Sequence, residues 1–168
     1  PGHRDCMIGS NSAPLIADAY IKGVRGFDVE TLYQAMLKNS ENEGPLTSVG
    51  RKGVKYYNDL GYVPYDVKIN ENAARTLEYA YDDFVLGKVA EKLGKKADAE
   101  ILAQRAKNYK NVIDPQTGWA RGRYANGSWI TKFDPFAQRS SFITEGSPAQ
   151  YTFYVPHDIQ GLIAQVGG

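Results

Sequence analysis

The amino-acid sequence predicts a mainly α-helical domain, in which helical hairpins are joined by long loops and β structure is limited to small ribbons. Three observations carry this prediction. Apolar residues recur every three or four positions over long stretches, glycines close these stretches, and the segments between them are rich in turn-forming residues. About four or five helices are expected, which is typical of a helical toroid or of a generic α-helical domain.

Size and charge exclude several classes of protein. The chain has 168 residues, 42% of them hydrophobic, so it can bury a core and is not disordered. Its 20 Lys and Arg residues are balanced by 19 Asp and Glu residues, which leaves no field to attract nucleic acid or an anionic membrane. No apolar stretch approaches the roughly 20 residues that span a bilayer. We therefore expect neither a nucleic-acid partner nor a membrane-spanning segment.

The N-terminal part of the sequence predicts two helices. Residues 13–24 form an apolar run followed by glycines, which indicates a short buried helix. Asp28 can cap a second helix over residues 29–38, whose inner face is expected to consist of Leu32, Ala35, Met36 and Leu37. Residues 40–53 are polar and rich in glycine, so they predict a loop.

A helical hairpin is the clearest element of the sequence. The Tyr-rich residues 56–65 contain Gly and Pro, and they predict an irregular connector over the surface of the core. Apolar residues then recur at helical spacing from Glu71 to Leu93, where Gly94 ends the helix. Residues 95–112 repeat the pattern, and we expect them to form an antiparallel partner helix with an inner face that includes Ile101, Leu102 and Tyr109.

The C-terminal third begins with turn sequences. Residues 114–138 include Asn126-Gly127, a strong hairpin signal, so irregular or short β structure is expected there. Asp158 then follows a proline and can cap a last helix over residues 159–166.

Carboxylates are the candidate reactive groups, because the chain lacks nucleotide and metal motifs in recognisable form. Glu78 and Asp82 are four residues apart on the predicted helix, with tyrosines between them. Such an acidic and aromatic face could line a sugar site. The simpler interpretation, a solvated or salt-bridged helix face with tyrosines packed below, is favoured for these residues alone.

Glu145 is a different kind of candidate. It is a lone carboxylate at a predicted junction between a loop and a helix, and Gly146 would let the backbone approach a ligand closely. A partly desolvated aromatic pocket raises the pKa of a carboxyl toward the value that a general acid needs, and the aromatic neighbours are Phe142, Tyr151 and Phe153. The alternative is that Glu145 only favours the positive end of the following helix.

Two further groups have open interpretations. His157-Asp158 could bind substrate hydroxyls, or it could be a turn histidine followed by a helix cap, and the cap is favoured from the residues alone. Trp119, Tyr124 and Trp129 could form a platform on which sugars stack, although aromatic residues more often anchor a loop to a core.

Several stretches of the chain, in order, resemble the bacterial α-mannosidases of glycoside hydrolase family 92. The match runs almost from end to end, and the number of pieces in the right order makes it specific. The stretches are Asp5-Cys6-Met7-Ile8-Gly9-Ser10-Asn11-Ser12-Ala13-Pro14, Ala17 to Gly23, Thr76 to Phe84, Arg105 to Val112, Asp114-Pro115, Thr117-Gly118, Arg121-Gly122-Arg123, Gly127-Ser128-Trp129, Thr144-Glu145-Gly146, Tyr151-Thr152-Phe153 and Val155-Pro156-His157-Asp158.

The resemblance implies a fold and a reaction. Family members have an N-terminal β-sandwich followed by an (α/α)6 toroid, bind calcium, and hydrolyse terminal α-mannosides with inversion. Residues 1–168 would then be a fragment of the toroid, with the β-sandwich before Pro1 and the rest of the toroid after Gly168. The resemblance makes Glu145 the general acid and Gln150, His157 and Asp158 substrate-binding residues, whereas the aspartates that supply the base lie after Gly168. It does not assign the calcium ligands.

The sequence departs from the family pattern beside the proposed acid. The family stretch reads Glu-Gly-Asn-Ala-Trp-Gln-Tyr, whereas Ser147, Pro148 and Ala149 follow Gly146 here. The loss of the tryptophan alters the expected sugar contacts but keeps the proton donor. An inverting glycosidase needs an acid and a base about 6.5 to 9.5 Å apart, so the fragment alone is expected to be inactive.

The resemblance also implies a location and partners. Mannose-containing glycans are the expected substrates, in the bacterial periplasm or outside the cell. An apolar flank left by the missing helices could be covered by a second copy of the chain. The alternatives are another helical-toroid glycosidase or lyase, and a carbohydrate-binding domain without catalytic activity.

Overall fold

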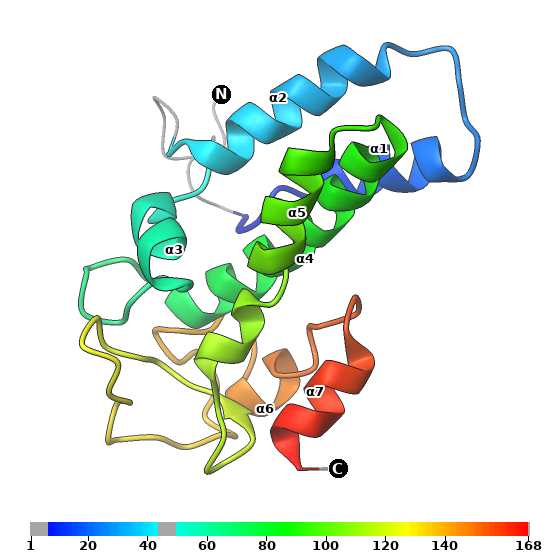
Figure 1. Cartoon of the computed structure of the whole chain (residues 1–168). Coiled ribbons are helices and arrows are strands. Elements are labelled where there is room, and N and C mark those ends of the chain that lie inside the picture. Colours follow the sequence, from blue (N-terminus) through cyan, green and yellow to red (C-terminus); the bar gives the residue numbers. More distant parts are fainter. Residues whose placement is uncertain (1–6, 44–49, 168) are drawn as a thin grey trace. The chain divides into compact units, whose positions relative to one another are not determined.

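The computed structural model describes residues 7–43 and 50–167, and these residues are mainly helical, as predicted (Figure 1). The chain divides into two compact units. The first comprises Pro1–Val54 and Tyr79–Lys107, and the second comprises Lys55–Glu78 and Asn108–Gly168. In helix α4 (Asn72–Lys92), the residues up to Glu78 belong to the second unit and those from Tyr79 belong to the first. Asp5 and Cys6, with which the family-like stretches begin, lie outside the described residues.

The first unit is built from α1 (Ser12–Ile21), α2 (Val29–Glu41), the second part of α4 and α5 (Lys96–Arg105). The predicted cap of α2 is confirmed, because the Asp28 carboxylate accepts a hydrogen bond of 3.0 Å from the backbone N–H of Thr31. The buried core of this unit consists of Ala13, Ala17, Tyr33, Met36, Val85, Leu86, Val89, Ala90, Ala99 and Leu102.

The predicted hairpin of α4 and α5 is also confirmed. Gly94 ends α4 with a φ of 73°, a left-handed conformation that glycine adopts without strain. A Cβ atom at Gly87 would lie 3.3 Å from the Cβ atom of Leu102, so the small residue lets the two helices approach closely. The two helices lie side by side in Figure 1.

Three expectations for the first unit were wrong in detail. Helix α5 ends at Arg105 rather than at residue 112, and a separate 3₁₀ helix, η1 (Asn108–Val112), follows in the second unit. The side chain of Ile101, expected on an inner face, is 57% exposed, and that of Leu15, in the helix expected to be buried, is 71% exposed. In α2, Tyr33 and Ser40 are buried, whereas Ala35 is exposed.

The second unit contains α3 (Val54–Leu60), η1, α6 (Pro148–Tyr151), α7 (Ile159–Val166) and a small ribbon. The ribbon pairs β1 (Ile113–Asp114) antiparallel with β2 (Trp119–Ala120), in agreement with the predicted short β structure. The aspartate cap of the last helix is confirmed, because Asp158 accepts a hydrogen bond from the backbone N–H of Gly161.

The Tyr-rich connector differs from the prediction. Its first residues form α3, and Tyr57, Tyr62 and Val63 are buried rather than spread over the surface. Tyrosine permits this burial because its hydroxyl can still find a partner, and the Tyr62 hydroxyl donates to the Tyr124 carbonyl at 2.8 Å. The connector is therefore part of the core of the second unit.

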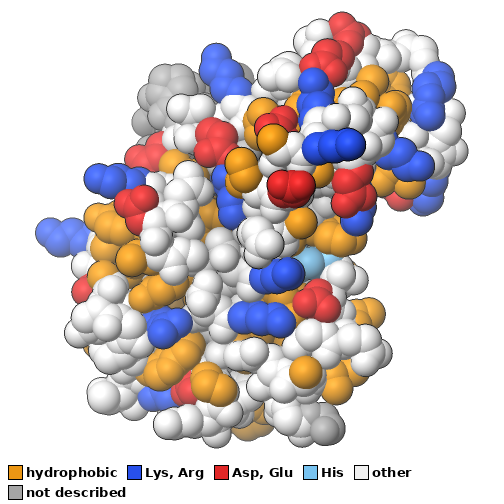
Figure 2. Space-filling model, in the orientation of Figure 1, with side chains coloured by type: hydrophobic (Ala, Val, Ile, Leu, Met, Phe, Trp, Pro, Cys, Tyr) orange, Lys and Arg blue, Asp and Glu red, His pale blue; other side chains and the backbone are white. Residues whose placement is uncertain are grey.

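The surface agrees with the balanced charge of the sequence. On the face shown in Figure 2, acidic and basic side chains are interspersed, and no large area of one sign is present. Among the described residues, no helix is long and apolar enough to cross a membrane.

Candidate active site around Glu145

Glu145 lies on a loop with an unusual backbone conformation. Its φ is 51°, in the left-handed region that residues other than glycine rarely adopt. Its side chain is exposed, and among the described residues it takes part in no ion pair or hydrogen bond. Strained backbone of this kind often occurs at functional sites, where the surrounding structure holds it in place. The carboxyl is therefore reachable from solvent, rather than partly desolvated as the sequence suggested.

The start of this loop is attached to the N-terminus of α4. The carbonyl of Phe142 accepts hydrogen bonds of 3.1 Å from the backbone N–H groups of both Ala73 and Ala74, and the Ser141 carbonyl accepts one of 2.6 Å from Glu71. The first N–H groups of a helix have no partner within the helix. The loop supplies these partners, so its position is fixed by the end of α4.

The end of the loop is fixed by a capping box at the start of α6. The Ser147 hydroxyl accepts from the Gln150 N–H, and the Gln150 amide oxygen accepts from the Ser147 N–H at 2.9 Å. Pro148 occupies the first turn, where its fixed φ and missing N–H are tolerated. The spacing of Ser147 and Gln150 in the sequence was a signal that could have predicted this box.

Gly146 lies against the capping box at the start of α6. The left-handed residue is Glu145 rather than Gly146. A Cβ atom at Gly146 would lie 3.1 Å from the Gln150 amide oxygen, so a larger residue would require this amide to shift by a few tenths of an ångström. The departures from the family stretch at Ser147 and Pro148 are thus compatible with a well-formed helix start.

Tyr151, the last residue of α6, connects this helix to α4. Its hydroxyl donates a hydrogen bond of 2.6 Å to a carboxylate oxygen of Glu78, which is only 8% exposed. Burial raises the pKa of Glu78 above its usual value, and hydrogen bonds from the hydroxyls of Tyr151 and Tyr154 lower it in part. Burial and the neighbouring carboxylate likewise raise the pKa of Tyr151. Sequence reasoning grouped Glu78 with Asp82 and did not find this pairing.

The raised pKa of Glu78 predicts a pH-dependent stability. An acid whose pKa is raised by folding stabilises the folded state most when it is protonated in both states, and this contribution is lost as the pH rises through the folded-state pKa. We therefore expect Glu78→Gln to gain stability relative to the unsubstituted protein as the pH rises from 4 towards neutrality. Urea unfolding midpoints of the two proteins across this range would measure the difference. A difference that does not change with pH would contradict the prediction.

His157 and Asp158 lie beside Tyr109 at the start of α7. The two carboxylate oxygens of Asp158 accept from the Gly161 N–H at 3.0 Å and from the Tyr109 hydroxyl at 2.7 Å. The hydrogen bond from Tyr109 is the main cause of the lowered pKa of Asp158. The His157 ring contacts the Tyr109 ring edge-on, with centroids 5.6 Å apart. The helix cap that the sequence favoured is present, and it engages both oxygens of the carboxylate.

The aromatic residues of the turn-rich segment have separate partners. The Tyr124 ring contacts the Tyr65 ring edge-on, and the Arg123 guanidinium lies over the Trp129 ring, 5.0 Å from its centroid. The Trp119 ring contacts the exposed rings of Phe136 and Phe153, with centroids 6.1 Å and 6.4 Å apart. The three predicted platform residues do not share one stack, and Tyr124 and Trp129 anchor their segment.

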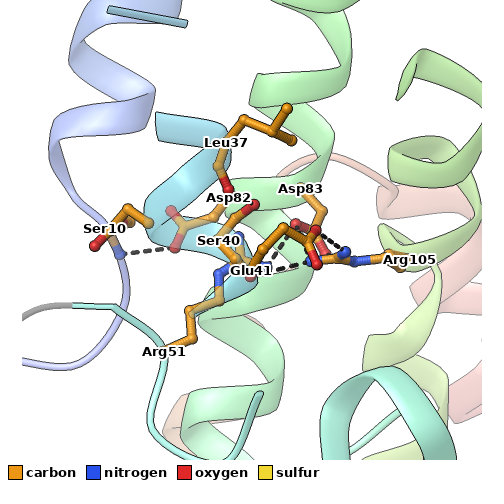
Figure 3. Close-up of polar contacts among 9 residues, drawn as sticks. Ser10, Leu37, Ser40, Glu41, Arg51, Asp82, Asp83 and Arg105 are labelled. Atoms are coloured by element: carbon orange, nitrogen blue, oxygen red, sulfur yellow. Dashed lines mark hydrogen bonds and ion pairs between the residues drawn. The ribbon is translucent and has the colours of Figure 1, made fainter. Parts of the chain in front are cut away.

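In the first unit, the two adjacent aspartates of α4, Asp82 and Asp83, are buried and make polar contacts (Figure 3). Asp82 accepts a hydrogen bond of 2.7 Å from the Ser10 N–H. Asp83 is fully buried and pairs with Arg51 at 2.6 Å and with Arg105 at 3.0 Å. Arg105 also pairs with Glu41. Of the predicted solvated or salt-bridged face, the aspartates are buried rather than solvated, and the ion pairs are made by Asp83 with arginines that are distant in the sequence.

The described residues do not form a recognisable metal site. Among residues 7–43 and 50–167, no group of three or more His, Cys, Asp or Glu side chains is placed to hold a metal ion. Calcium prefers six to eight oxygen ligands, most of them from carboxylates and carbonyls. The side chains described here do not fit that requirement.

Most glycoside hydrolases use a pair of Asp or Glu residues, and Glu145 is an exposed carboxyl that could be one member of such a pair. The chain belongs to glycosyl hydrolase family 92, because the model of the family's catalytic domain matches residues 1–168.

Individual relatives agree with this assignment. A family GH92 inverting mannosidase from Bacteroides thetaiotaomicron is 42% identical, with a TM-score of 0.93 over 100% of this chain and 23% of that chain. A family GH92 α-mannosidase from the same organism is 42% identical, with a TM-score of 0.87 over 96% of this chain and 21% of that chain. An uncharacterised secreted glycosidase of Arthroderma benhamiae is 32% identical over 95% of this chain and 24% of its own length. The chain therefore spans between a fifth and a quarter of these relatives.

Proposed function

We propose that the intact protein hydrolyses terminal α-mannosidic linkages with inversion and that Glu145 is its general acid. The observation that carries the proposal is the position of Glu145, an exposed carboxyl that forms no ion pair within residues 7–43 and 50–167 and lies on a loop that is fixed at both ends. A general acid must be reachable by the leaving oxygen and must be able to hold a proton. The mannosidases among the relatives support the choice of substrate.

In this mechanism Glu145 protonates the oxygen of the leaving group while a second carboxylate activates water on the opposite face of the sugar. The two carboxyl groups of an inverting enzyme are about 6.5 to 9.5 Å apart, which leaves room for that water. We propose that the base is supplied by a part of the protein outside this chain. Residues 1–168 alone are then inactive.

Gln150, His157 and Asp158 are the proposed substrate-binding residues. In Gln150 the amide oxygen closes the capping box, so the amide nitrogen is the group that would donate to a sugar hydroxyl. The Asp158 oxygens already accept two hydrogen bonds. A carboxylate has about four acceptor positions, so Asp158 can accept from a sugar hydroxyl without losing the cap. His157 is half-buried beside it.

The wider setting follows from the family and the relatives. We propose that the chain is a section of an (α/α)6 toroid that is completed, together with a β-sandwich, by other parts of the protein. The mannose-containing glycans that it acts on would be met in the periplasm or outside the cell, in line with the secreted relative. Calcium would be bound by ligands outside the described residues, and it would supply a Lewis acid that grips sugar hydroxyls.

Assays of the intact protein test this proposal. On defined α-mannobiosides we expect mannose release, with the β-anomer as the first product in a time-resolved NMR spectrum, and no release of glucose from the matched α-glucosides. Addition of a chelator should reduce the rate if calcium is required. Release of glucose, or a first product with retained configuration, would contradict the proposal.

A further inference from the structure

Glu78 is a buried carboxylate whose environment differs from that of the other buried acids of α4. Asp83 is paired with two arginines, whereas among the described residues Glu78 forms no ion pair and is instead hydrogen-bonded by tyrosine. The removal of a carboxylate from water is costly when no cation compensates for it. Ionisable groups kept in such surroundings cluster at functional sites. The surroundings of Glu78 thus favour a role beyond stability.

The partner of Glu78 belongs to the segment that presents Glu145. Tyr151 ends α6, and α6 begins directly after the Glu145 loop. A helix of a single turn is not stable by itself in water, so the position of α6 depends on its tertiary bonds. Backbone bonds from Ala149 to the Pro135 carbonyl and from Ala120 to the Thr152 hydroxyl, each 2.8 Å long, hold one side. The bond from Tyr151 to Glu78 attaches α6 to α4.

Helix α4 thus binds the chain both before and after Glu145. Ala74 binds the Phe142 carbonyl before Glu145, and Glu78 binds the Tyr151 hydroxyl after it. The backbone N–H of Ala74 and the Glu78 side chain belong to residues four apart, so the two attachment points are about one helical turn from each other along α4. Because a helical turn is rigid, the distance between the two attachment points is fixed. The left-handed conformation of Glu145 lies between them.

We propose that Glu78 is a positioning residue for the reaction, which holds Tyr151 and thereby fixes the loop that directs the Glu145 carboxyl toward the leaving oxygen. The proposal rests on the proposed role of Glu145 as general acid. Glu78 itself does not touch the substrate in this account. Its effect should be confined to the step in which Glu145 donates its proton, since Glu78 acts only through the position of that carboxyl. A displacement of a catalytic group by about 1 Å can lower a rate about 100-fold.

The test uses the intact protein and a series of α-mannosides with leaving groups of increasing basicity. We expect Tyr151→Phe and Glu78→Leu to lower kcat about 10- to 100-fold on the most basic leaving groups. The loss should be only a few-fold on activated aryl mannosides, whose departure needs little protonation. Glu78→Gln keeps an acceptor for the Tyr151 hydroxyl and should restore most of the activity that Glu78→Leu loses.

A matched control is a second hydrogen bond from a tyrosine hydroxyl to a carboxylate, in the first unit. The Tyr33 hydroxyl donates to Asp98 at 2.7 Å, and Tyr33 is fully buried. Tyr33→Phe removes an equivalent bond far along the sequence from Glu145, so it should leave the dependence on the leaving group unchanged. Thermal unfolding of each variant separates loss of folded protein from loss of catalysis. If Glu78→Leu does not fold, Tyr151→Phe and Glu78→Gln still carry the test.

The outcomes separate this inference from the proposed function. If Glu145→Gln shows the leaving-group dependence and Tyr151→Phe shows it too, the positioning role is supported. If Glu145→Gln shows it while Tyr151→Phe and Glu78→Leu lower all rates equally, or lower none, the positioning role is refuted and the acid role stands. If Glu145→Gln itself lacks the dependence, both the acid role and the positioning role are refuted.

Discussion

Substitution of Glu145 by glutamine is expected to lower kcat about 10²- to 10⁴-fold on mannosides with basic leaving groups, the usual contribution of a general acid. Glutamine has nearly the same shape, so it should keep the loop but cannot donate the proton that the leaving oxygen requires. Activated aryl mannosides leave without much protonation and should lose little. Rates across such a series, measured with the intact protein, would show a steeper dependence on leaving-group basicity in the variant.

Glu71 provides a matched control for this experiment. It is also a glutamate in the left-handed region, with a φ of 60°, but its carboxylate accepts a hydrogen bond of 3.1 Å from Arg75. Glu71→Gln should therefore change the rates on all substrates by a similar small factor. Equal losses on both kinds of substrate in Glu145→Gln would mean that Glu145 is not the acid.

A second prediction concerns the free energy of unfolding of the first unit. We expect Asp83→Ala to destabilise the first unit by about 3 to 5 kcal/mol, because it removes the buried carboxylate that pairs with both Arg51 and Arg105. Asp83 is fully buried, and its partner Arg51 is only 1% exposed. The Arg51 guanidinium would keep its contact with the Tyr79 ring, 5.1 Å from its centroid, but would lose its ion pair with Asp83.

Hydrogen exchange of the α4 amides in the intact protein would measure this loss. A destabilisation of this size corresponds to exchange about 10²- to 10³-fold faster or more, provided that the amides exchange by local opening. Asp18→Ala is the control, since Asp18 forms an exposed pair of 2.9 Å with Lys22, a kind of pair that typically contributes less than about 1 kcal/mol. Similar exchange in both variants would show that the buried network does not hold the unit.

Local signals in the sequence are sufficient to predict most of the helices. The helix α4, the hairpin that it forms with α5 and the aspartate caps of α2 and α7 follow from local rules. Helical spacing, a glycine stop and a side chain that bonds to an N–H three residues away are all properties of neighbouring residues. The position of Glu145 between a loop and a helix start could be predicted for the same reason.

The hydrogen-bond and ion-pair partners of the acidic residues could not be predicted from the sequence and depend on the tertiary structure. The sequence placed Glu78, Asp82 and Asp83 on one helix, but their partners Tyr151, Ser10 and Arg51 are distant along the chain. Burial depends on what packs against a face, and neither spacing nor composition contains that information. The same reason explains why residues 108–112 form a separate 3₁₀ helix and do not continue α5 as predicted. There the Tyr109 hydroxyl is bound by Asp158, and the Asn111 amide donates to the Gly61 carbonyl, so long-range bonds prevail over local helix propensity.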